Sequence, residues 1–171
     1  KTIGANALLV RTGALYHDIG KMTDPLYYVE NQQGADNPLL KMDPRDAAQV
    51  VIAHVMEGEK IARKHRLPEV VVNFITTHHG TSLVRYFYNT YCNAHPNDKV
   101  DETIFRYPGP KPSTKEAAIL MMADAIEARS RSLDDFSEKA IANAVNQMID
   151  SQIADGQFSE TPLSFKDVED I

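Results

Sequence analysis

Six histidine and aspartate side chains interrupt stretches of sequence that are otherwise apolar. They fall in four places along the chain: His17–Asp18, His54, His78–His79 and Asp124. Imidazole and carboxylate groups are the ligands that proteins offer to iron, manganese, zinc or nickel. Burying several ionisable groups in one domain is costly unless they pair with one another or bind a metal. The residue types therefore predict a metal centre built from distant parts of the chain.

A glycine closely follows each of the two adjacent polar pairs. Neighbouring residues of an α-helix point about 100° apart, so an adjacent pair can face one centre only where the helix ends. Gly20 follows His17–Asp18, and Gly80 follows His78–His79. Because glycine is typical of helix ends, we expect both pairs to turn toward one site. Asp18 has two carboxylate oxygens and is the best candidate to bridge two ions.

Helical patterns dominate the sequence around these residues. Apolar residues recur at three- and four-residue intervals, which is typical of amphipathic helices. They predict helices over residues 3–19, 43–65, 68–80, 113–132 and 135–154. Asp43 followed by Pro44 favours a helix start, and Ser113 with Glu116 forms a capping-box pattern. Ser164 is expected to cap one more helix, so the architecture is predicted to be all-α.

Two of the six polar residues share a helix face with apolar neighbours. His54 lies on the same stripe as Val50 and Ile61, and Asp124 lies in line with Leu120. Both side chains are therefore expected to point inward. Taken one at a time, each could be an ordinary hydrogen-bonded core residue; taken together, the six favour a site.

The composition is typical of a globular domain, with 43% hydrophobic and 25% charged residues. A formal charge of −6 argues against a basic face for long nucleic acid. The single Cys92 cannot form an internal disulfide. No apolar run approaches the roughly 20 residues needed to cross a bilayer. Residues 22–42 and 81–112 are expected to be loops, apart from a short aromatic stretch, "RYFYNTY".

The order His-Asp, His, His-His, Asp resembles the two-metal members of the HD-domain metal-dependent phosphohydrolase superfamily. The motifs "HDIGK", "HHG" and "MADAIEA" follow one another in the order of that family. Further stretches are similar to its membrane-anchored seven-transmembrane-receptor branch, namely "ENQ" at 30–32, "HHGTSLVRYFY" and "FRYPGPKPSTKEAAIL". That branch hydrolyses the bacterial second messenger cyclic di-AMP to linear pApA, and the resemblance covers nearly the whole chain.

The resemblance implies a helical HD-domain bundle with a metal site in its core. Residues 1–171 would form one such domain, truncated at both ends. It implies two divalent metal ions, with iron or manganese expected. The first ion would be held by His17, Asp18 and Asp124. The second would be held by His54, His78 and His79, with Asp18 bridging. Family members usually carry a further histidine on an earlier helix, and none precedes His17 here.

The resemblance also implies a mechanism and a set of substrate contacts. Two ions about 3.5–4 Å apart acidify a bridging water, and the hydroxide attacks phosphorus in line, with Asp18 as a catalytic residue. Lys21 would reach the same phosphate as a point charge. Thr81 could hydrogen-bond the substrate, and Arg129 and Arg131 could bind the second phosphate or a ribose. Tyrosines that could stack on an adenine are Tyr27, Tyr28, Tyr86 and Tyr88.

Each of these substrate contacts could instead have a purely structural role. Lys21 could serve the helix dipole, Thr81 could cap its turn, and the two arginines could be solvated helix ends. The tyrosines could simply pack the loop against the helices.

The expected partner is a cyclic dinucleotide, and an oligomer is possible. Membrane attachment would come only through a segment outside this chain, which would be the cytoplasmic domain of a bacterial inner-membrane protein. A competing hypothesis is an HD hydrolase for another nucleotide, such as cyclic di-GMP, a deoxynucleotide or an alarmone. The sequence after His79 reads "GTSLVRYF" and lacks the Gly-Tyr-Pro motif of the cyclic di-GMP branch. A non-catalytic nucleotide-binding module and a bundle whose histidines are merely core are also compatible with the sequence.

Overall fold

The computed structural model describes residues 2–28, 31–32 and 37–171. Apart from one isolated antiparallel bridge between Leu83 and Arg106, these described residues form no β-structure, which confirms the all-α prediction. The α-helices are α1 (Ala7–Tyr16), α2 (Pro44–Lys64), α3 (Glu69–Thr77), α4 (Arg85–Ala94), α5 (Lys115–Ser130), α6 (Glu138–Ala154) and α7 (Phe165–Glu169). Short 3-10 helices are η1 (Ile19–Met22), η2 (Pro25–Tyr27), η4 (Pro38–Lys41) and η5 (Glu102–Phe105). Glu30 of the "ENQ" stretch lies outside the described residues.

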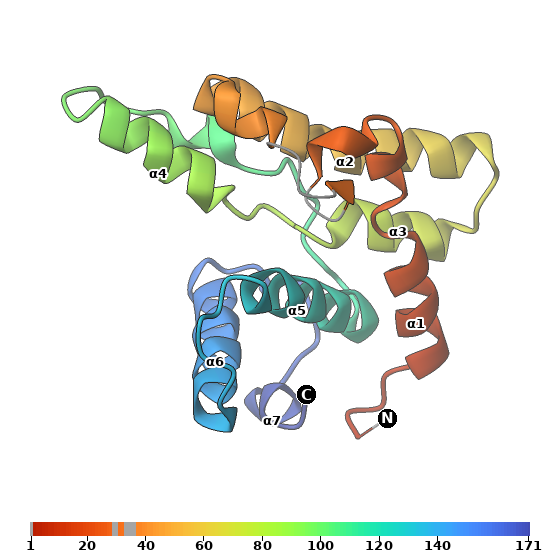
Figure 1. Cartoon of the computed structure of the whole chain (residues 1–171). Helices are drawn as coiled ribbons and strands as arrows, with labels where there is room; N and C mark the ends of the chain where they lie inside the picture. Colours follow the sequence, from red (N-terminus) through yellow and green to blue (C-terminus); the bar gives the residue numbers. More distant parts are fainter. Residues whose placement is uncertain (1, 29–30, 33–36) are drawn as a thin grey trace.

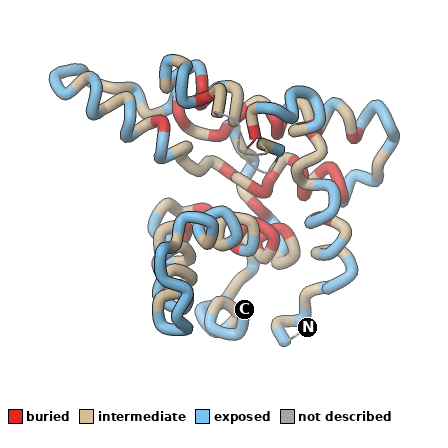
Figure 2. Tube along the Cα trace, in the orientation of Figure 1, coloured by how far each residue is buried: buried red, intermediate tan, exposed pale blue. Residues whose placement is uncertain are grey.

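The helices form two groups, one of α2, α3 and α4 and the other of α5, α6 and α7 (Figure 1). In the first group α2 packs against η1, α3 and α4, and in the second α5 packs against α6. Helix α1 contacts both α3 and α5, and α3 also contacts α5. Buried stretches run through α2, α3 and the first half of α5, shown red in Figure 2. Buried residues of α3 and α5 therefore lie where the two groups contact each other.

Phe74 of α3 joins the two groups. It is 2% exposed and packs with Ala117 and Leu120 of α5. On its other side α1 approaches so closely that a Cβ at Gly13 would lie 2.6 Å from the Phe74 ring. A glycine at this position lets α1 lie against α3 and carry its last residues to the junction.

Several sequence features act as expected at the helix ends. The Asp43 side chain accepts a hydrogen bond from the N–H of Arg45, and Pro44 is the first residue of α2. Ser164 caps α7 in a capping box with Asp167, which confirms the predicted additional helix. The predicted box at Ser113 and Glu116 is wrong.

The cap of α5 is Thr114, one residue later than predicted. Its side chain accepts from the N–H of Ala117, at 3.2 Å. The carboxylate of Glu116 instead accepts from the backbone N–H of Asn6, at 2.7 Å. Tertiary contact with the N-terminal segment therefore takes the group that a local box would have used.

Two helix boundaries also differ from the sequence prediction. Helix α1 covers Ala7–Tyr16 instead of residues 3–19, because the side chain of Asn6 caps its first turn and the chain tightens into η1 after Asp18. The aromatic stretch "RYFYNTY", excepted from the expected loop, lies within the ten-residue α4, which extends three residues beyond it to Ala94. Its buried Phe87 packs in one cluster with Ala47 and Ala48 of α2, so tertiary packing stabilises a helix whose local signals are weak.

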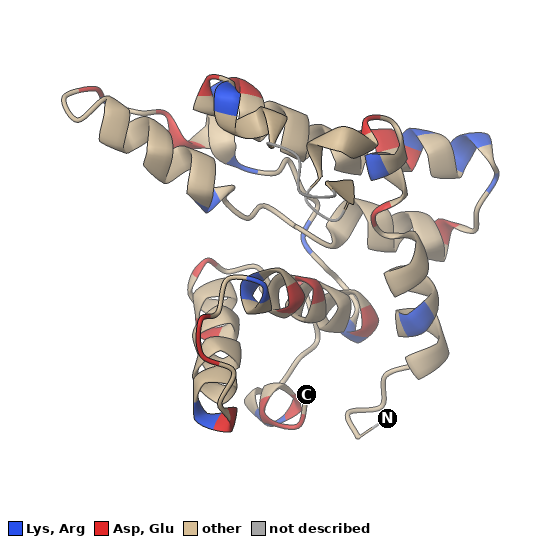
Figure 3. Cartoon of the chain, viewed as in Figure 1, with Lys and Arg blue, Asp and Glu red and all other residues tan. Residues whose placement is uncertain are grey.

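Charged residues of both signs are interspersed along α2 and α5 in Figure 3. Arg63, for example, pairs with Glu59 at 2.8 Å and with Glu69 at 3.0 Å. Among the described helices, none combines the length and the apolar character that a membrane span requires.

Candidate metal centre

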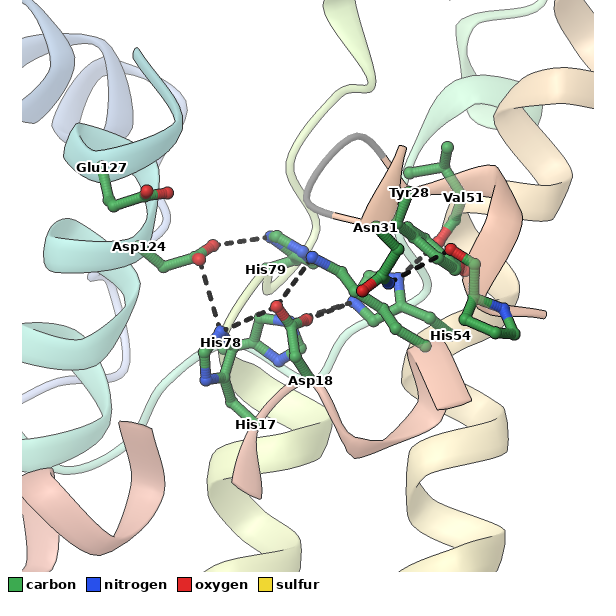
Figure 4. Close-up of polar contacts among 12 residues, drawn as sticks. His17, Asp18, Tyr28, Asn31, Val51, His54, His78, His79, Asp124 and Glu127 are labelled. Atoms are coloured by element: carbon green, nitrogen blue, oxygen red, sulfur yellow. Dashed lines mark hydrogen bonds and ion pairs between the residues drawn. The ribbon is translucent and has the colours of Figure 1, made fainter. Parts of the chain in front are cut away.

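The six polar residues singled out in the sequence come together at the junction of the two helix groups. His17 and Asp18 follow α1, His54 lies on α2, His78 and His79 follow α3, and Asp124 lies on α5. Figure 4 shows their side chains pointing toward one another from these separate segments, with Asp18 in the middle. Two subsets of their ligand atoms lie within 4.8 Å of one another: His54, His78 and His79, and His17, Asp18 and His78.

Asp18 faces both subsets with different oxygen atoms. Its Oδ1 lies 3.4 Å from Nε2 of His54 and 3.7 Å from Nε2 of His78. Its Oδ2 lies 3.2 Å from Nε2 of His17 and 2.7 Å from Nζ of Lys21. One carboxylate therefore presents an oxygen to each side, which is what a group shared between two ions requires.

Asp124 connects the second helix group to the cluster. Its Oδ1 lies 3.4 Å from Nε2 of His17, and its Oδ2 lies 3.8 Å from Nδ1 of His79. Since His17 also contacts Asp18, the cluster is continuous from α5 through the end of α1 to α2 and α3.

Backbone carbonyl groups orient three of the four imidazoles. Nδ1 of His17 donates to the carbonyl of Ala14 at 3.0 Å, and Nδ1 of His78 donates to that of Ile75 at 2.8 Å. Nδ1 of His54 makes the equivalent bond to Val51 at 2.5 Å. A carbonyl can only accept, so each Nδ1 carries a proton and each Nε2 points into the cluster, where it bears the lone pair whenever the ring is neutral. This is the arrangement in which metal-binding histidines are usually held.

The donor set fits a bound cation. Nε2 of His54 and Nε2 of His78 lie 3.1 Å apart. Two nitrogens bound to one ion at about 2.1 Å each are roughly 3 Å apart when they meet at a right angle. Among the described residues, Nε2 of His17 and Oδ1 of Asp18 are buried and have no hydrogen-bond partner. Buried polar atoms without partners are rare in folded proteins, and a cation would satisfy these two.

Burial and the neighbouring charges shift the pKa values of the cluster in opposite directions. Burial lowers the pKa of His78 to about 4, and it also lowers the pKa values of His54 and His79. For His17 burial acts in the same direction, but the carboxylates of Asp124 and Asp18 outweigh it and raise the pKa to about 10. Burial would raise the pKa of Asp18, but His17 and Lys21 hold it well below its usual range. The three rings of lowered pKa are therefore neutral at pH 7 and able to bind a metal.

Gly20 allows η1 to lie directly on α2. A Cβ at this position would overlap the carbonyl oxygen of His54 and would lie 2.6 Å from the backbone nitrogen of Gly58. The glycine predicted to end a helix thus has a second role. It brings the segment that carries Asp18 into contact with the helix that carries His54.

The second polar pair lies just past its helix, and not within its last turn as predicted. Helix α3 ends at Thr77, His78 is its C-terminal cap and His79 follows. Gly80 then adopts a left-handed backbone with φ of +50°. The turn allows two consecutive imidazoles to approach one centre, which a continuing helix would prevent.

Two pockets adjoin the cluster and share His79, Tyr107 and Asp124 in their walls. One, of about 560 Å³, contains Lys21 and Arg131. The other, of about 410 Å³, contains residues of α5 and α6, including Arg129 and Gln152. Both volumes lie in the range of small-molecule sites.

The residues expected to contact a substrate lie in different places. Lys21 and Arg131 line a pocket, where Arg131 pairs with Glu127 at 2.8 Å. Arg129 lines the other pocket and donates to Ser132 Oγ. Thr81 is outside the residues that line these two pockets; its Oγ1 accepts from Nε2 of Gln157 at 3.1 Å, so its contact is with the protein.

Of the four tyrosines, only Tyr28 is among the residues that line these two pockets. Tyr27 and Tyr88 pack around the core cluster that contains Phe105, and Tyr86 is 61% exposed. Sequence reasoning missed Tyr107, which stacks on His79 with ring centroids 4.2 Å apart. Its only signal was a place in the unusual stretch "FRYPGPKP".

A family model for the HD domain matches residues 1–129. This chain belongs to the HD-domain family. Divalent metal binding is typical of HD domains, and the cluster of histidine and aspartate residues described above agrees with it.

Individual relatives are similar over nearly the whole chain. The cyclic-di-AMP phosphodiesterase PgpH of Bacillus subtilis is 42% identical over 171 residues, which cover 100% of this chain and 24% of the relative. The protein of the same name from Listeria monocytogenes is 37% identical over 166 residues, covering 97% and 23%. The chain therefore spans about a quarter of the length of these curated relatives.

A solved structure shares the fold. The crystal structure of the HD domain of L. monocytogenes phosphodiesterase PgpH in complex with cyclic-di-AMP matches with a TM-score of 0.93 and 37% identity. The match covers 98% of this chain and 78% of that one.

Proposed function

We propose that this chain is a metal-dependent phosphodiesterase that hydrolyses cyclic di-AMP to linear pApA, with residues 1–171 acting as one HD phosphohydrolase domain. The observation that carries the proposal is the convergence of six nitrogen and oxygen donors beside two pockets. Two buried atoms among them, Nε2 of His17 and Oδ1 of Asp18, have no hydrogen-bond partner in the described part of the chain. The substrate is supported by the 42% identity to a protein named a cyclic-di-AMP phosphodiesterase.

In this proposal the centre holds two divalent ions, iron or manganese, which suit nitrogen and oxygen ligands. One ion is assigned to His17, Asp18 and Asp124. The other is assigned to His54, His78 and His79, with Asp18 shared. When bound, the two ions supply a water of lowered pKa and compensate negative charge on phosphoryl oxygens.

The remaining roles belong to side chains of the pockets. Lys21 is held 2.7 Å from Asp18 at the wall of the larger pocket, where its ammonium group can bind a phosphate of the substrate. Arg131 in the same pocket and Arg129 in the neighbouring one can bind the second phosphate or a ribose. Tyr107 stacks on His79 and helps to exclude water from one face of the cluster. Thr81 has no role in this scheme, because its hydroxyl contacts Gln157.

The wider setting follows from the resemblance to the membrane-anchored branch. By that resemblance, this chain acts in the cytoplasm as part of a bacterial inner-membrane protein, and its partner is the soluble cyclic dinucleotide. Each pocket carries two cationic side chains, Lys21 and Arg131 in one and Arg85 and Arg129 in the other, which suits a small phosphorylated ligand better than a long nucleic acid.

Product analysis tests the proposal directly. The metal-loaded protein is incubated with cyclic di-AMP, cyclic di-GMP and cyclic GMP–AMP, and the products are separated and identified by mass. We expect pApA as the product and cyclic di-AMP as the preferred substrate, with the activity lost in Asp18→Asn. Binding without hydrolysis would identify a non-catalytic module, and preference for another nucleotide would overturn the substrate assignment.

A further inference from the structure

His79 differs from the other three imidazoles of the cluster. His17, His54 and His78 each donate from Nδ1 to a carbonyl three residues earlier, whereas Nδ1 of His79 faces Asp124 Oδ2 at 3.8 Å. His79 lies two residues beyond the end of α3, so the helix cannot orient its ring in the same way. Other parts of the chain must fix its position.

The residue that follows this turn, Thr81, has both its backbone N–H and its carbonyl bound by side chains from distant segments. Its N–H donates to Oε1 of Gln157 at 2.9 Å. Its carbonyl accepts from Nη1 of Arg106 at 2.8 Å. Gln157 lies 76 positions later in the chain and is 0% exposed.

Asp155 ties these two side chains together. Its Oδ2 accepts from Nε2 of Gln157 at 2.8 Å, and its two oxygens accept from the guanidinium of Arg106 at 3.0 and 3.1 Å. The amide of Gln157 also donates to Oγ1 of Thr81 at 3.1 Å. Arg106, Asp155 and Gln157 thus form a closed set of hydrogen bonds around one residue, Thr81, and these three side chains are here called the turn clamp.

The turn between the imidazole and the clamp has little freedom. A Cβ at Gly80 would overlap Oε1 of Gln157, so the clamp lies directly against the turn. The N–H of Ser82 donates to the carbonyl of His79 at 3.0 Å, and the N–H of Tyr107 donates to the carbonyl of Ser82 at 3.0 Å. The Tyr107 ring then stacks on His79. These contacts connect His79 to the clamp and to the segment of Arg106.

Two members of the turn clamp lie outside the part of the chain that the HD family model matches. That match ends at residue 129, whereas Asp155 and Gln157 follow the end of α6. We infer that the turn after α6 is a positioning element of the metal centre, in which Gln157, fixed by Asp155 and Arg106, sets His79 for metal binding. This inference rests on the proposed ligation by His79 and is independent of the substrate.

Metal binding tests the inference without reference to hydrolysis. Mn²⁺ is titrated into metal-free wild-type protein and Gln157→Leu, and free Mn²⁺ is followed by electron paramagnetic resonance. Loss of an outer partner of a ligand typically weakens metal affinity by about 10- to 100-fold, and we expect that loss for one of the two ions. Co²⁺ loaded into both proteins should show a changed visible absorption spectrum in the variant, since the His79 ligand field is disturbed.

Matched variants separate positioning from folding. Gln147→Leu makes the same change at an exposed site on α6 and should bind Mn²⁺ like wild type. Gln157→Glu combined with Asp155→Asn exchanges the acid and the amide, keeps the net charge and keeps an acceptor for Thr81, and should recover most of the affinity. Asp155→Asn alone is isosteric and gives a milder test if Gln157→Leu does not fold.

The outcomes distinguish this inference from the proposed function. A wild-type protein that binds no divalent metal would overturn both. Wild-type binding of two ions with unchanged affinity and Co²⁺ spectra in Gln157→Leu and Asp155→Asn would overturn the positioning role alone.

Discussion

The α-carbon of Gly20 lies against the backbone carbonyl of His54, with no room for a side chain between them. This contact brings Asp18, two residues earlier, within 3.4 Å of the His54 imidazole. The approach of two backbones, and not only the choice of polar side chains, therefore determines the geometry of the cluster.

Gly20→Ala should both destabilise the protein and disturb the metal centre. The new methyl group meets backbone atoms of His54 and Gly58, which cannot rotate away, so we expect a loss of about 1–3 kcal/mol or more in the free energy of unfolding. Urea denaturation of the metal-free proteins measures it. Gly4→Ala is the control, because a Cβ at Gly4 would have no atom within 4 Å and only its φ of +77° opposes the change. Equal losses in the two variants would contradict the steric explanation.

Lys21→Met should impair hydrolysis without removing the metals. The ammonium group contributes positive charge at the pocket wall, and removing one such preorganised group typically lowers the rate by about 10²-fold. Steady-state kinetics with cyclic di-AMP, together with metal analysis of the purified variant, measure both effects. Lys60→Met removes an exposed lysine that pairs with Glu57 and should leave the kinetics unchanged. Wild-type kinetics in Lys21→Met would assign this lysine to the helix end alone.

Metal binding should release a proton from His17. Its pKa of about 10 means that the metal-free protein carries His17 as an imidazolium at pH 8, whereas His54 and His78, with lowered pKa values, are already neutral. A metal must displace the proton, so affinity should rise with pH up to about 10. Calorimetric titration at pH 8 in buffers of different ionisation enthalpy should report about one proton from His17 in addition to that released by the metal-bound water.

The same shift determines the pH dependence of folding in the metal-free protein. The folded pKa of His17 lies above its ordinary value of 6.5. Its contribution to stability is therefore fully present below pH 6.5 and is lost as the pH rises through about 10. His17→Gln should abolish this dependence and reduce the proton release by about one per chain. An unchanged proton release in that variant would assign the proton to another group.

Removal of the metals should lower stability, because the proposed ligands come from the segments of α1, α2, α3 and α5. A ligand at 100 times its dissociation constant stabilises a folded protein by about 2.7 kcal/mol, provided that it does not bind the unfolded chain. The melting temperature should therefore rise with Mn²⁺ concentration and fall on chelation. Asp18→Asn should show a much weaker dependence, and an identical dependence in both proteins would show that Mn²⁺ binds elsewhere.

The sequence was sufficient to predict the helical class and the six polar residues of the cluster, because each is a chemical exception within an apolar pattern. His54 and Asp124 fall on buried stripes, and the adjacent pairs precede glycines. The helix boundaries were harder to predict from the sequence. Glu116 reads as part of a local capping box, yet it accepts from Asn6, 110 positions away, and such a long-range contact leaves no local signal.

The residues that the sequence could not reveal act through long-range contacts. Gln157 and Asp155 are ordinary polar residues after a helix, and nothing in their neighbourhood indicates that they hold the turn after His79. Thr81 is predicted to contact the substrate because it follows the histidine pair in the sequence. Its hydrogen bonds with Gln157 depend instead on how α6 docks. Local sequence patterns identify the residue types of the cluster, whereas the docking of helices such as α6 determines which distant residues contact them.

The carbonyl groups that fix His17, His54 and His78 belong to the main chain, and every amino acid supplies the same carbonyl. Substitutions at Ala14, Val51 and Ile75 can therefore alter packing while the acceptor itself is retained. The orientation of these three imidazoles is thereby little affected by substitutions in the surrounding side chains. Residues that line the pockets can change toward new ligands while the histidines keep their orientation.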